Sequence, residues 1–487
     1  MAQPLRPPCE DKLLPVAPCP DEEGAELIDP GVRRRVLAAC ILASSMTFID
    51  GSALTVAAPA ISAAFAMDFA ALQWIFNAYV LALAGLTMAG GALADHYGRA
   101  RALSVGVAGF VIASIACAMA PSTEALIAGR LAQGIAGALL TPASLALIAA
   151  VYPKDERGAA IGAWASASAL TTAAGPLVGG WLTETLSWRW IFWINAPIAA
   201  GSLVFLRAAP KERTSPLAFD FAGAGLLTLS LSALAGCLAA LAPSESAAGA
   251  SDETGNVALA ALTGAIGTGA LVLFARRLRR APHPLAPPAL LTDPLFLRIN
   301  AATFGLYAGL SILFFLLPFE LISERRFGAT VVGAAFLPFT LLVGVLSQRF
   351  GELADRIGAM RMIAAGAGVA ALSFAWFALA RQASAFIGVV LPMTLLGLAF
   401  ALLVAPLSAA ALSAASEADQ GIASGVNNTV SRIAQMAGVG VAAAFISRPD
   451  GFVVALFVAG ALALSAAVAS SGGPMTGVTR LRPSTGG

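Results

Sequence analysis

Residues 91–99 read GALADHYGR, and residues 351–358 read GELADRIG, so one pattern returns 260 positions later in the chain. Each copy lies between two apolar stretches, and we expect it to form a short inner loop whose glycines permit a tight turn. A pattern that returns in this way indicates two structurally related halves. Two halves of six helices would place the copies only roughly 200 residues apart, so we also expect an insertion between the halves.

The composition of the chain is that of a membrane protein. Apolar residues make up 58% of the sequence and charged residues 11%, whereas soluble domains have roughly 45–50% and 25%. Apolar stretches of about 18 residues or more can each cross the hydrocarbon core as a helix. The alternating pattern of a transmembrane β-barrel is absent from the sequence. The predicted fold class is therefore all-α, integral to the lipid bilayer.

Several classes of function are disfavoured by the sequence. The net charge is only +2, and no block rich in Lys and Arg with interleaved aromatic residues occurs, which argues against a nucleic-acid partner. The five cysteines are scattered and form no metal-binding pattern, so we predict no metal. No Walker, HExxH or GxSxG motif occurs, and we therefore predict no catalytic residues, no enzyme activity and no cofactor.

Apolar runs between charged or Pro/Gly-marked breaks predict fourteen transmembrane helices. Their expected ranges are 36–57, 71–94, 101–120, 124–150, 158–183, 188–207, 219–242, 256–275, 298–319, 328–348, 359–380, 384–413, 421–446 and 452–470. The ranges 124–150 and 384–413 are long and contain proline, and we interpret each as one tilted or kinked helix.

The distribution of Lys and Arg predicts the orientation. With the N-terminus inside, twenty of the 29 basic residues fall near span ends on the inner side and five on the outer side. We expect a multi-pass protein of the cytoplasmic (inner) membrane with both termini cytoplasmic. Its expected parts are a disordered cytoplasmic tail (1–32), a six-helix bundle (33–213), two additional transmembrane helices and a linker (214–292), a second six-helix bundle (293–471) and a cytoplasmic tail (472–487).

One carboxylate and one guanidinium of the N-terminal half are predicted to lie within the membrane. An ionised acid at the depth of Asp50 costs at least about 2.5–3.5 kcal/mol. Burial raises a carboxyl pKa and a nearby cation lowers it, so Asp50 could bind and release a proton. Arg130 stays charged and could hold a carboxylate or another anionic group. The alternatives are an interfacial acid that orients its helix and an arginine that snorkels to the surface.

The fourth span carries a small, polar face around Arg130. Gln133, Gly134, Gly137 and Thr141 share this face by helical spacing. Such a face can line a cavity or let another backbone approach closely.

The repeated pattern supplies candidate latch residues, meaning residues that would hold the two halves together at the cytoplasmic side. An acid there can accept hydrogen bonds from a helix N-terminus of the opposite half. A purely orienting role for the charges is the alternative. The candidates are Gly91, Asp95, Gly98, Arg99, Asp355 and Arg356.

The fifth span contains closely spaced glycines around a proline. The residues are Gly175, Pro176, Gly179 and Gly180. Small residues allow close helix crossing, and proline bends a helix. Ordinary packing explains this pattern as well as a functional motif does.

Together these residues resemble the major facilitator superfamily over about 33–470. The segment 91–101 is similar to its signature between helices two and three, 130–134 to its fourth-helix signature for proton coupling, and 175–180 to its antiporter signature. With fourteen spans and Asp50 in the first, the chain looks like the EmrB/QacA-type drug:H+ antiporters. The resemblance implies proton coupling through Asp50 and Arg130, driven by the proton motive force.

The chain departs from this family in ways that bear on its substrate. Ser52 stands where threonine is usual, and His96 where arginine or lysine is usual. Acids of the second half lie near span ends, so neutral and anionic substrates stay open. We expect a proton-coupled exporter of small amphipathic compounds or drugs, working by alternating access. The alternatives are a proton-coupled metabolite importer or symporter, and a ligand-binding membrane protein without transport. A periplasmic adaptor and an outer-membrane channel, which some relatives use, stay open as partners.

Overall fold

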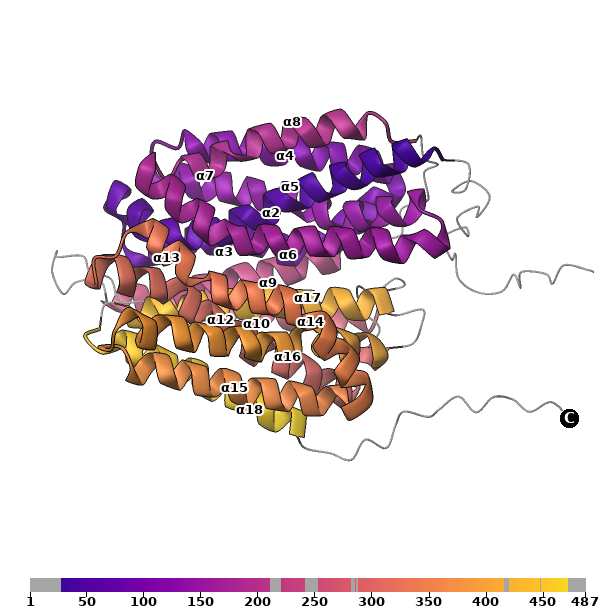
Figure 1. Ribbon diagram of the computed structural model, residues 1–487. Coiled ribbons are helices and arrows are strands. Elements are labelled where there is room, and N and C mark those ends of the chain that lie inside the picture. Colours follow the sequence, from indigo (N-terminus) through magenta and orange to yellow (C-terminus); the bar gives the residue numbers. More distant parts are fainter. Residues whose placement is uncertain are drawn as a thin grey trace, which may run out of the picture.

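The computed structural model describes residues 28–210, 220–240, 253–281, 285, 288–415, 420–446 and 448–471. Within these ranges every regular element is a helix (Figure 1). Nearly all of the predicted N-terminal tail and the whole C-terminal tail lie outside the described residues.

The helices of the first half follow the predicted spans. They are α2 (Pro30–Phe65), α3 (Phe69–Tyr97), α4 (Arg99–Ala118), α5 (Thr123–Val151), α6 (Lys154–Thr185), α7 (Trp190–Trp193) and α8 (Asn195–Leu206). The short helix α7 and the helix α8 together occupy the predicted span 188–207.

The helices of the rest of the chain also follow the predicted spans. Its helices are α9 (Phe221–Ala240), α10 (Glu253–Leu278), α11 (Pro288–Thr292), α12 (Pro294–Phe319), α13 (Ala329–Ala335), α14 (Leu337–Ile357), α15 (Ala359–Leu379), α16 (Leu391–Ser413), α17 (Gln420–Phe445) and α18 (Gly451–Ser471). A π-helical turn, Glu320–Glu324, extends α12, and another, Phe386–Val390, precedes α16.

The helices form two groups, which Figure 1 shows as α2–α8 and α12–α18. The helices α9 and α10 pack against each other, and α9 also contacts α3 of the first group and α17 of the second. Leu231 of α9 lies in one buried cluster with Leu81 of α3 and Met436 of α17. The inserted helices therefore lie beside the junction of the two groups.

Length and composition support a membrane location. In the described part of the chain, nine helices are long and apolar enough to cross a bilayer, and three shorter stretches are also apolar. Thr123–Val151 and Phe386–Ser413 are each one continuous span, which confirms their interpretation as single helices. Every predicted span coincides with a helix or a helix pair, while fourteen membrane crossings stay a prediction.

The two halves begin and turn in the same way. Asp29 and Asp293 cap their first helices, each accepting a backbone hydrogen bond of 2.7 Å, and a proline follows each aspartate. Gly98 and Gly358, which follow α3 and α14, have φ angles of 96° and 99°. Side chains with a Cβ rarely adopt this conformation. The repeat in the sequence is thus a repeat in backbone structure.

The expectation that residues 91–99 and 351–358 form loops is wrong. Residues 91–97 complete α3, and residues 351–357 complete α14. Gly98 and Gly358 each connect to the next helix directly, because a glycine with positive φ can redirect the chain within one residue.

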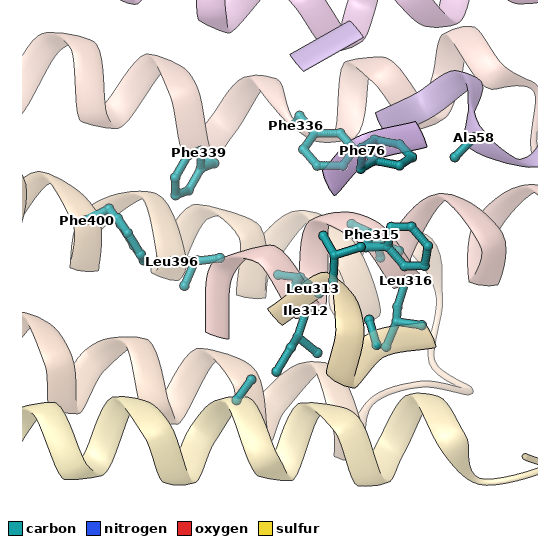
Figure 2. Close-up of a cluster of buried hydrophobic side chains, with 14 of the residues drawn as sticks. Ala58, Phe76, Ile312, Leu313, Phe315, Leu316, Phe336, Phe339, Leu396 and Phe400 are labelled. Atoms are coloured by element: carbon teal, nitrogen blue, oxygen red, sulfur yellow. The ribbon is translucent and has the colours of Figure 1, made fainter. Parts of the chain in front are cut away.

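A large buried cluster joins the two groups of helices at one end. We call this the distal end, meaning the end of the bundle away from Pro30 and Ser471. Figure 2 shows members of this cluster, among them Phe76 of α3, Phe315 of α12 and Phe336, which precedes α14. The ring centroids of Phe76 and Phe315 are 5.5 Å apart in an edge-to-face arrangement, which contributes about 0.5–1.5 kcal/mol beyond burial. The distal end is therefore closed by apolar contacts.

Labelling of introduced cysteines tests the predicted orientation of α9 and α10. In a background without other reactive cysteines, Ala250→Cys should react with a membrane-impermeant maleimide added outside intact cells. Arg279→Cys should react only after the membrane is permeabilised, because α10 separates the two positions. Labelling of both positions from the same side would contradict the predicted crossing.

Candidate functional site

Asp50 lies deep within α2. The helix runs from Pro30 to Phe65, so several turns flank Asp50 on both sides. Its side chain is 0% exposed. This placement differs from that of an interfacial acid, which would lie near a helix end and reach water.

Arg130 of α5 forms an ion pair with Asp50. Its Nη1 contacts Oδ2 of the carboxylate, and its Nε donates to the carbonyl of Ile75 on α3 at 3.3 Å. The guanidinium also lies 4.3 Å from the ring centroid of Tyr79, within cation–π distance. Arg130 is only 1% exposed, so it does not snorkel to the surface.

Gln133 connects the ion pair to further polar side chains. Its Nε2 donates to Asp50 Oδ1 at 3.2 Å and to Ser114 Oγ at 2.8 Å, while its Oε1 accepts from Arg130 at 2.8 Å. Ser114 also accepts from Asn195 Nδ2 at 3.2 Å. We call Asp50, Ser114, Arg130, Gln133 and Asn195 the buried network. It joins α2, α4, α5 and α8.

The geometry of the buried network limits what it can do chemically. Both charges are inaccessible, so a proton can reach Asp50 only after the surrounding helices move. A guanidinium cannot lose its proton under ordinary conditions, whereas a carboxylate can gain one. Protonation of Asp50 would leave Arg130 without its counter-charge. The network can therefore link proton binding to a change in helix packing.

Sequence reasoning identified the two charged residues but missed several of their partners. The sequence pattern did not identify Tyr79, Ser114 and Asn195 as partners of the ion pair, although each is a polar residue within an apolar span. Their polarity was the available signal. Which of the many polar residues face one another depends on helix rotation, which the sequence pattern does not specify.

The other residues of the predicted fourth-helix face differ in their environments. A Cβ at Gly134 would lie 2.5 Å from the carbonyl oxygen of Tyr79, so α3 and α5 approach closely there. Gly137 lies beside Thr47 and Phe110, and Thr141 is half-buried. This face of the fourth span was expected either to line a cavity or to let another backbone approach closely. At Gly134 the structure shows the close backbone approach. A cavity-lining role for these residues stays a prediction.

The structure describes the side-chain environment of only some of the candidate latch residues. Gly98 ends α3 with positive φ, Gly91 and Arg99 are half-buried, and Arg356 is exposed. The side chains of Asp95 and Asp355 lie outside the described residues. The latch therefore stays a prediction.

The fifth-helix motif packs against two different helices. A Cβ at Gly179 would lie 2.6 Å from the carbonyl oxygen of Ala53, and one at Gly175 would overlap Ser52, both on α2. On its other side, Gly180 lies against Ala329 of α13. The carbonyl of Pro176 similarly leaves no room for a Cβ at Gly333 of α13. The motif thus lets α6 approach both α2 and α13.

Glu184 adds a polar contact between the two groups at the distal end. Its Oε2 accepts a hydrogen bond of 2.7 Å from the backbone N–H of Thr330, in the first turn of α13. Hydrogen bonding from Thr330 lowers the pKa of Glu184, because it stabilises the charged carboxylate. The carboxylate also meets the positive end of the α13 dipole.

The ion pair predicts an asymmetric effect on stability. Asp50→Asn should destabilise the protein by about 3–5 kcal/mol, because it leaves Arg130 charged, buried and unpaired. The double variant Asp50→Asn with Arg130→Gln should recover most of that loss, because neither group is then charged. Thermal unfolding of all variants in the same detergent provides the measurement. Additive losses in the double variant would contradict a direct interaction.

Comparison with known proteins agrees with this architecture. The family model described as Major Facilitator Superfamily matches residues 40–439. The chain is 33% identical over 433 residues to the lincomycin resistance protein of Streptomyces lincolnensis, covering 86% of this chain and 87% of that protein. It is 31% identical over 399 residues to the multidrug resistance protein Stp of Mycobacterium tuberculosis (strain CDC 1551 / Oshkosh), covering 81% of this chain and 72% of that one.

A further relative is the puromycin resistance protein pur8 of Streptomyces alboniger, 34% identical over 332 residues. That match covers 67% of this chain and 64% of the relative, slightly less than two thirds of its length. The names of these relatives agree with the resemblance to drug:H+ antiporters.

Solved structures show the same fold at low sequence identity. A peptide transporter POT in complex with sulfate has a TM-score of 0.67 at 16% identity, covering 92% of this chain and 96% of that one. The xylose transporter XylE from E. coli, in a partially occluded inward-open conformation, has a TM-score of 0.58 at 16% identity, covering 90% and 97%. The chain is thus a multi-pass membrane protein with the fold of these transporters, and it belongs to the major facilitator superfamily.

Proposed function

We propose that this protein exports small amphipathic compounds in exchange for protons, by alternating access. The observation that carries the proposal is the ion pair between Asp50 and Arg130, buried beside the fifth-helix motif. Relatives named for lincomycin, puromycin and multidrug resistance support a small-molecule substrate and the direction of transport. The substrate crosses the membrane without chemical conversion.

In the proposed cycle, Asp50 carries the proton. When the distal end opens to the outside, a proton neutralises Asp50 and the ion pair with Arg130 is lost. When the opposite side opens to the cytoplasm, the proton leaves and the pair forms again. The helices must rearrange between these states, because Asp50 is 0% exposed when the distal end is closed.

The available energy is sufficient for this exchange. A membrane potential of about 100 mV supplies about 2.3 kcal/mol per proton, and a difference of one pH unit adds about 1.4 kcal/mol. A hundredfold substrate gradient requires about 2.8 kcal/mol, since each tenfold step costs about 1.4 kcal/mol. One proton per uncharged substrate molecule is therefore enough.

The distal closure is the proposed external gate. Gly180 and Gly333 bring α6 and α13 together, and Glu184 holds the first turn of α13. All these contacts join the first helix group to the second, so they must break when the protein opens outward. The fifth-helix motif lies between Asp50 and this gate, and it is the proposed route by which protonation affects opening.

We further infer the arrangement of the chain in the cell. The two six-helix bundles are 33–213 and 293–471, and the segment 214–292 lies beside them without entering the transport path. The contacts of α9 with α3 and α17 support this position. The excess of basic residues near span ends on one side supports cytoplasmic termini and a location in the inner membrane. The latch residues are proposed to hold the halves at the cytoplasmic side.

The Asp50→Asn variant tests the proton-coupling step. In proteoliposomes with an imposed pH gradient, this variant should lose uphill transport while keeping downhill substrate exchange, because the amide cannot carry the proton. Asp450→Asn, which changes an exposed acid at the distal end, is the matched control and should transport normally. Transport is measured as substrate uptake into these proteoliposomes, with the acidic side inside.

Other outcomes would assign a different function. Full pH-driven transport by Asp50→Asn would move the proton site elsewhere, and Glu320, which is buried and pairs with Arg381 at 2.9 Å, is the next candidate. Proton-driven movement in the opposite direction would identify an importer. Substrate binding without any flux would identify a ligand-binding membrane protein.

Gly333→Leu tests the external gate. The larger side chain cannot fit against Pro176, so the variant should favour the outward-open state and expose Phe76→Cys to a maleimide added outside. Gly344→Leu is the control, because a Cβ there meets nothing within 4 Å. Equal labelling rates in the two glycine variants would contradict the proposed closure.

A further inference from the structure

Arg432 of α17 is a second arginine within a predicted span, and it is not part of the buried network. It shares one helical face with Asn428 and Gln435, which lie four residues before it and three after it. Polar and charged residues within a span normally face the bundle interior or an aqueous space rather than lipid. This polar face of α17, formed by Asn428, Arg432 and Gln435, therefore needs an explanation.

The contacts of α17 show where the polar face is directed. On one side of it, Asn427 donates to Asn300 at 3.2 Å and to Thr303 at 2.8 Å, both on α12. On the other side, Met436 packs in a cluster with Leu81 of α3. The polar face lies between these two sides, so it points toward the region where the two helix groups meet.

The surroundings of Arg432 agree with this direction. Arg432 interacts electrostatically with Tyr79 on α3 and with Tyr307 on α12. One tyrosine belongs to each of the two helix groups. Asn428 is exposed, and Arg432 and Gln435 are half-buried, so the polar face remains accessible while the distal end is closed. In this fold, substrates bind near the midplane between the two halves.

Arg432 differs from Arg130 in its charge balance. Arg130 is neutralised by Asp50, whereas no carboxylate among the described residues forms an ion pair with Arg432. The carboxylates facing this region are Asp50, which Arg130 already holds, and Glu320, which pairs with Arg325 and Arg381 nearer the distal end. Arginines within membrane spans pair with acids or backbone carbonyls, or they mark the path of a substrate or ion.

We propose that Arg432, with Asn428 and Gln435, binds a carboxylate or similar anionic group of the transported substrate. The inference rests on the proposed function and specifies its substrate class as amphipathic anions. The planar guanidinium can donate two parallel hydrogen bonds to a carboxylate, and the amides of Asn428 and Gln435 supply further donors. An anionic lipid headgroup has the same charge, and the experiment below separates it from a soluble substrate.

The charge of the substrate affects the charge moved in each cycle. Exchange of one internal monovalent anion for one external proton carries two positive charge equivalents inward. A neutral substrate would give one, and a monovalent cation would give none. A membrane potential should therefore accelerate export of an anion more than export of a neutral analogue.

Three dansyl compounds test the proposal with one fluorophore: anionic dansylglycine, neutral dansylglycinamide and cationic dansylcadaverine. The wild-type protein in phosphatidylcholine vesicles should bind dansylglycine at least tenfold more tightly than the amide. Arg432→Gln should reduce dansylglycine affinity by at least tenfold, to that of the amide, and Arg432→Lys should retain part of the preference. Arg361→Gln, which removes an exposed arginine, is the matched control and should bind like the wild type.

The outcomes separate this inference from the proposed function. Proton-driven export of dansylcadaverine with no preference for dansylglycine would overturn the anion subsite and leave the exporter intact. Export of none of the three compounds under a pH gradient would contradict the exporter itself. Displacement of dansylglycine by phosphatidylglycerol, without any dansylglycine export, would assign Arg432 to a lipid and overturn the substrate inference.

Discussion

The Asp50–Arg130 ion pair requires the surrounding helices of the first group to supply further hydrogen-bond partners, because each charge would be costly alone in the membrane interior. Burying such a pair is tolerated only when its remaining hydrogen-bonding groups are satisfied. Gln133 and Ser114 satisfy part of that requirement, and the carbonyl of Ile75 accepts from Arg130. These partners come from α3, α4 and α5, so the pair determines how several helices are rotated against α2.

The same helix that carries Asp50 also contacts the fifth-helix motif. Ser52 and Ala53 lie two and three residues after Asp50, and they pack against Gly175 and Gly179 of α6. Gly180, on the other side of α6, lies against α13 of the second group. In a tightly packed interior a displacement at one contact cannot be absorbed locally. This continuity is the physical basis for connecting a proton at Asp50 with opening of the distal end.

Much of this architecture could be predicted from sequence because its determinants are local. The apolar runs predicted the helices, and the glycines of the repeated pattern predicted a tight turn, although the segments expected to form loops are helical up to Gly98 and Gly358. Asp50 and Arg130 were identifiable because charged residues are rare in apolar spans. The roles of Tyr79 and Asn195 were not predictable, since they depend on how helices from distant parts of the chain are rotated. Sequence spacing likewise could not tell which helices Gly179 and Gly180 face.

The central claim is that Asp50 exchanges its proton in step with the substrate. The most direct measurement is the number of protons that purified protein releases into weakly buffered solution when a transported compound is added. The account predicts that the wild-type protein releases about one proton per bound substrate, and that Asp50→Asn binds the same compound without this release. Equal proton release by the wild type and Asp50→Asn would contradict the account.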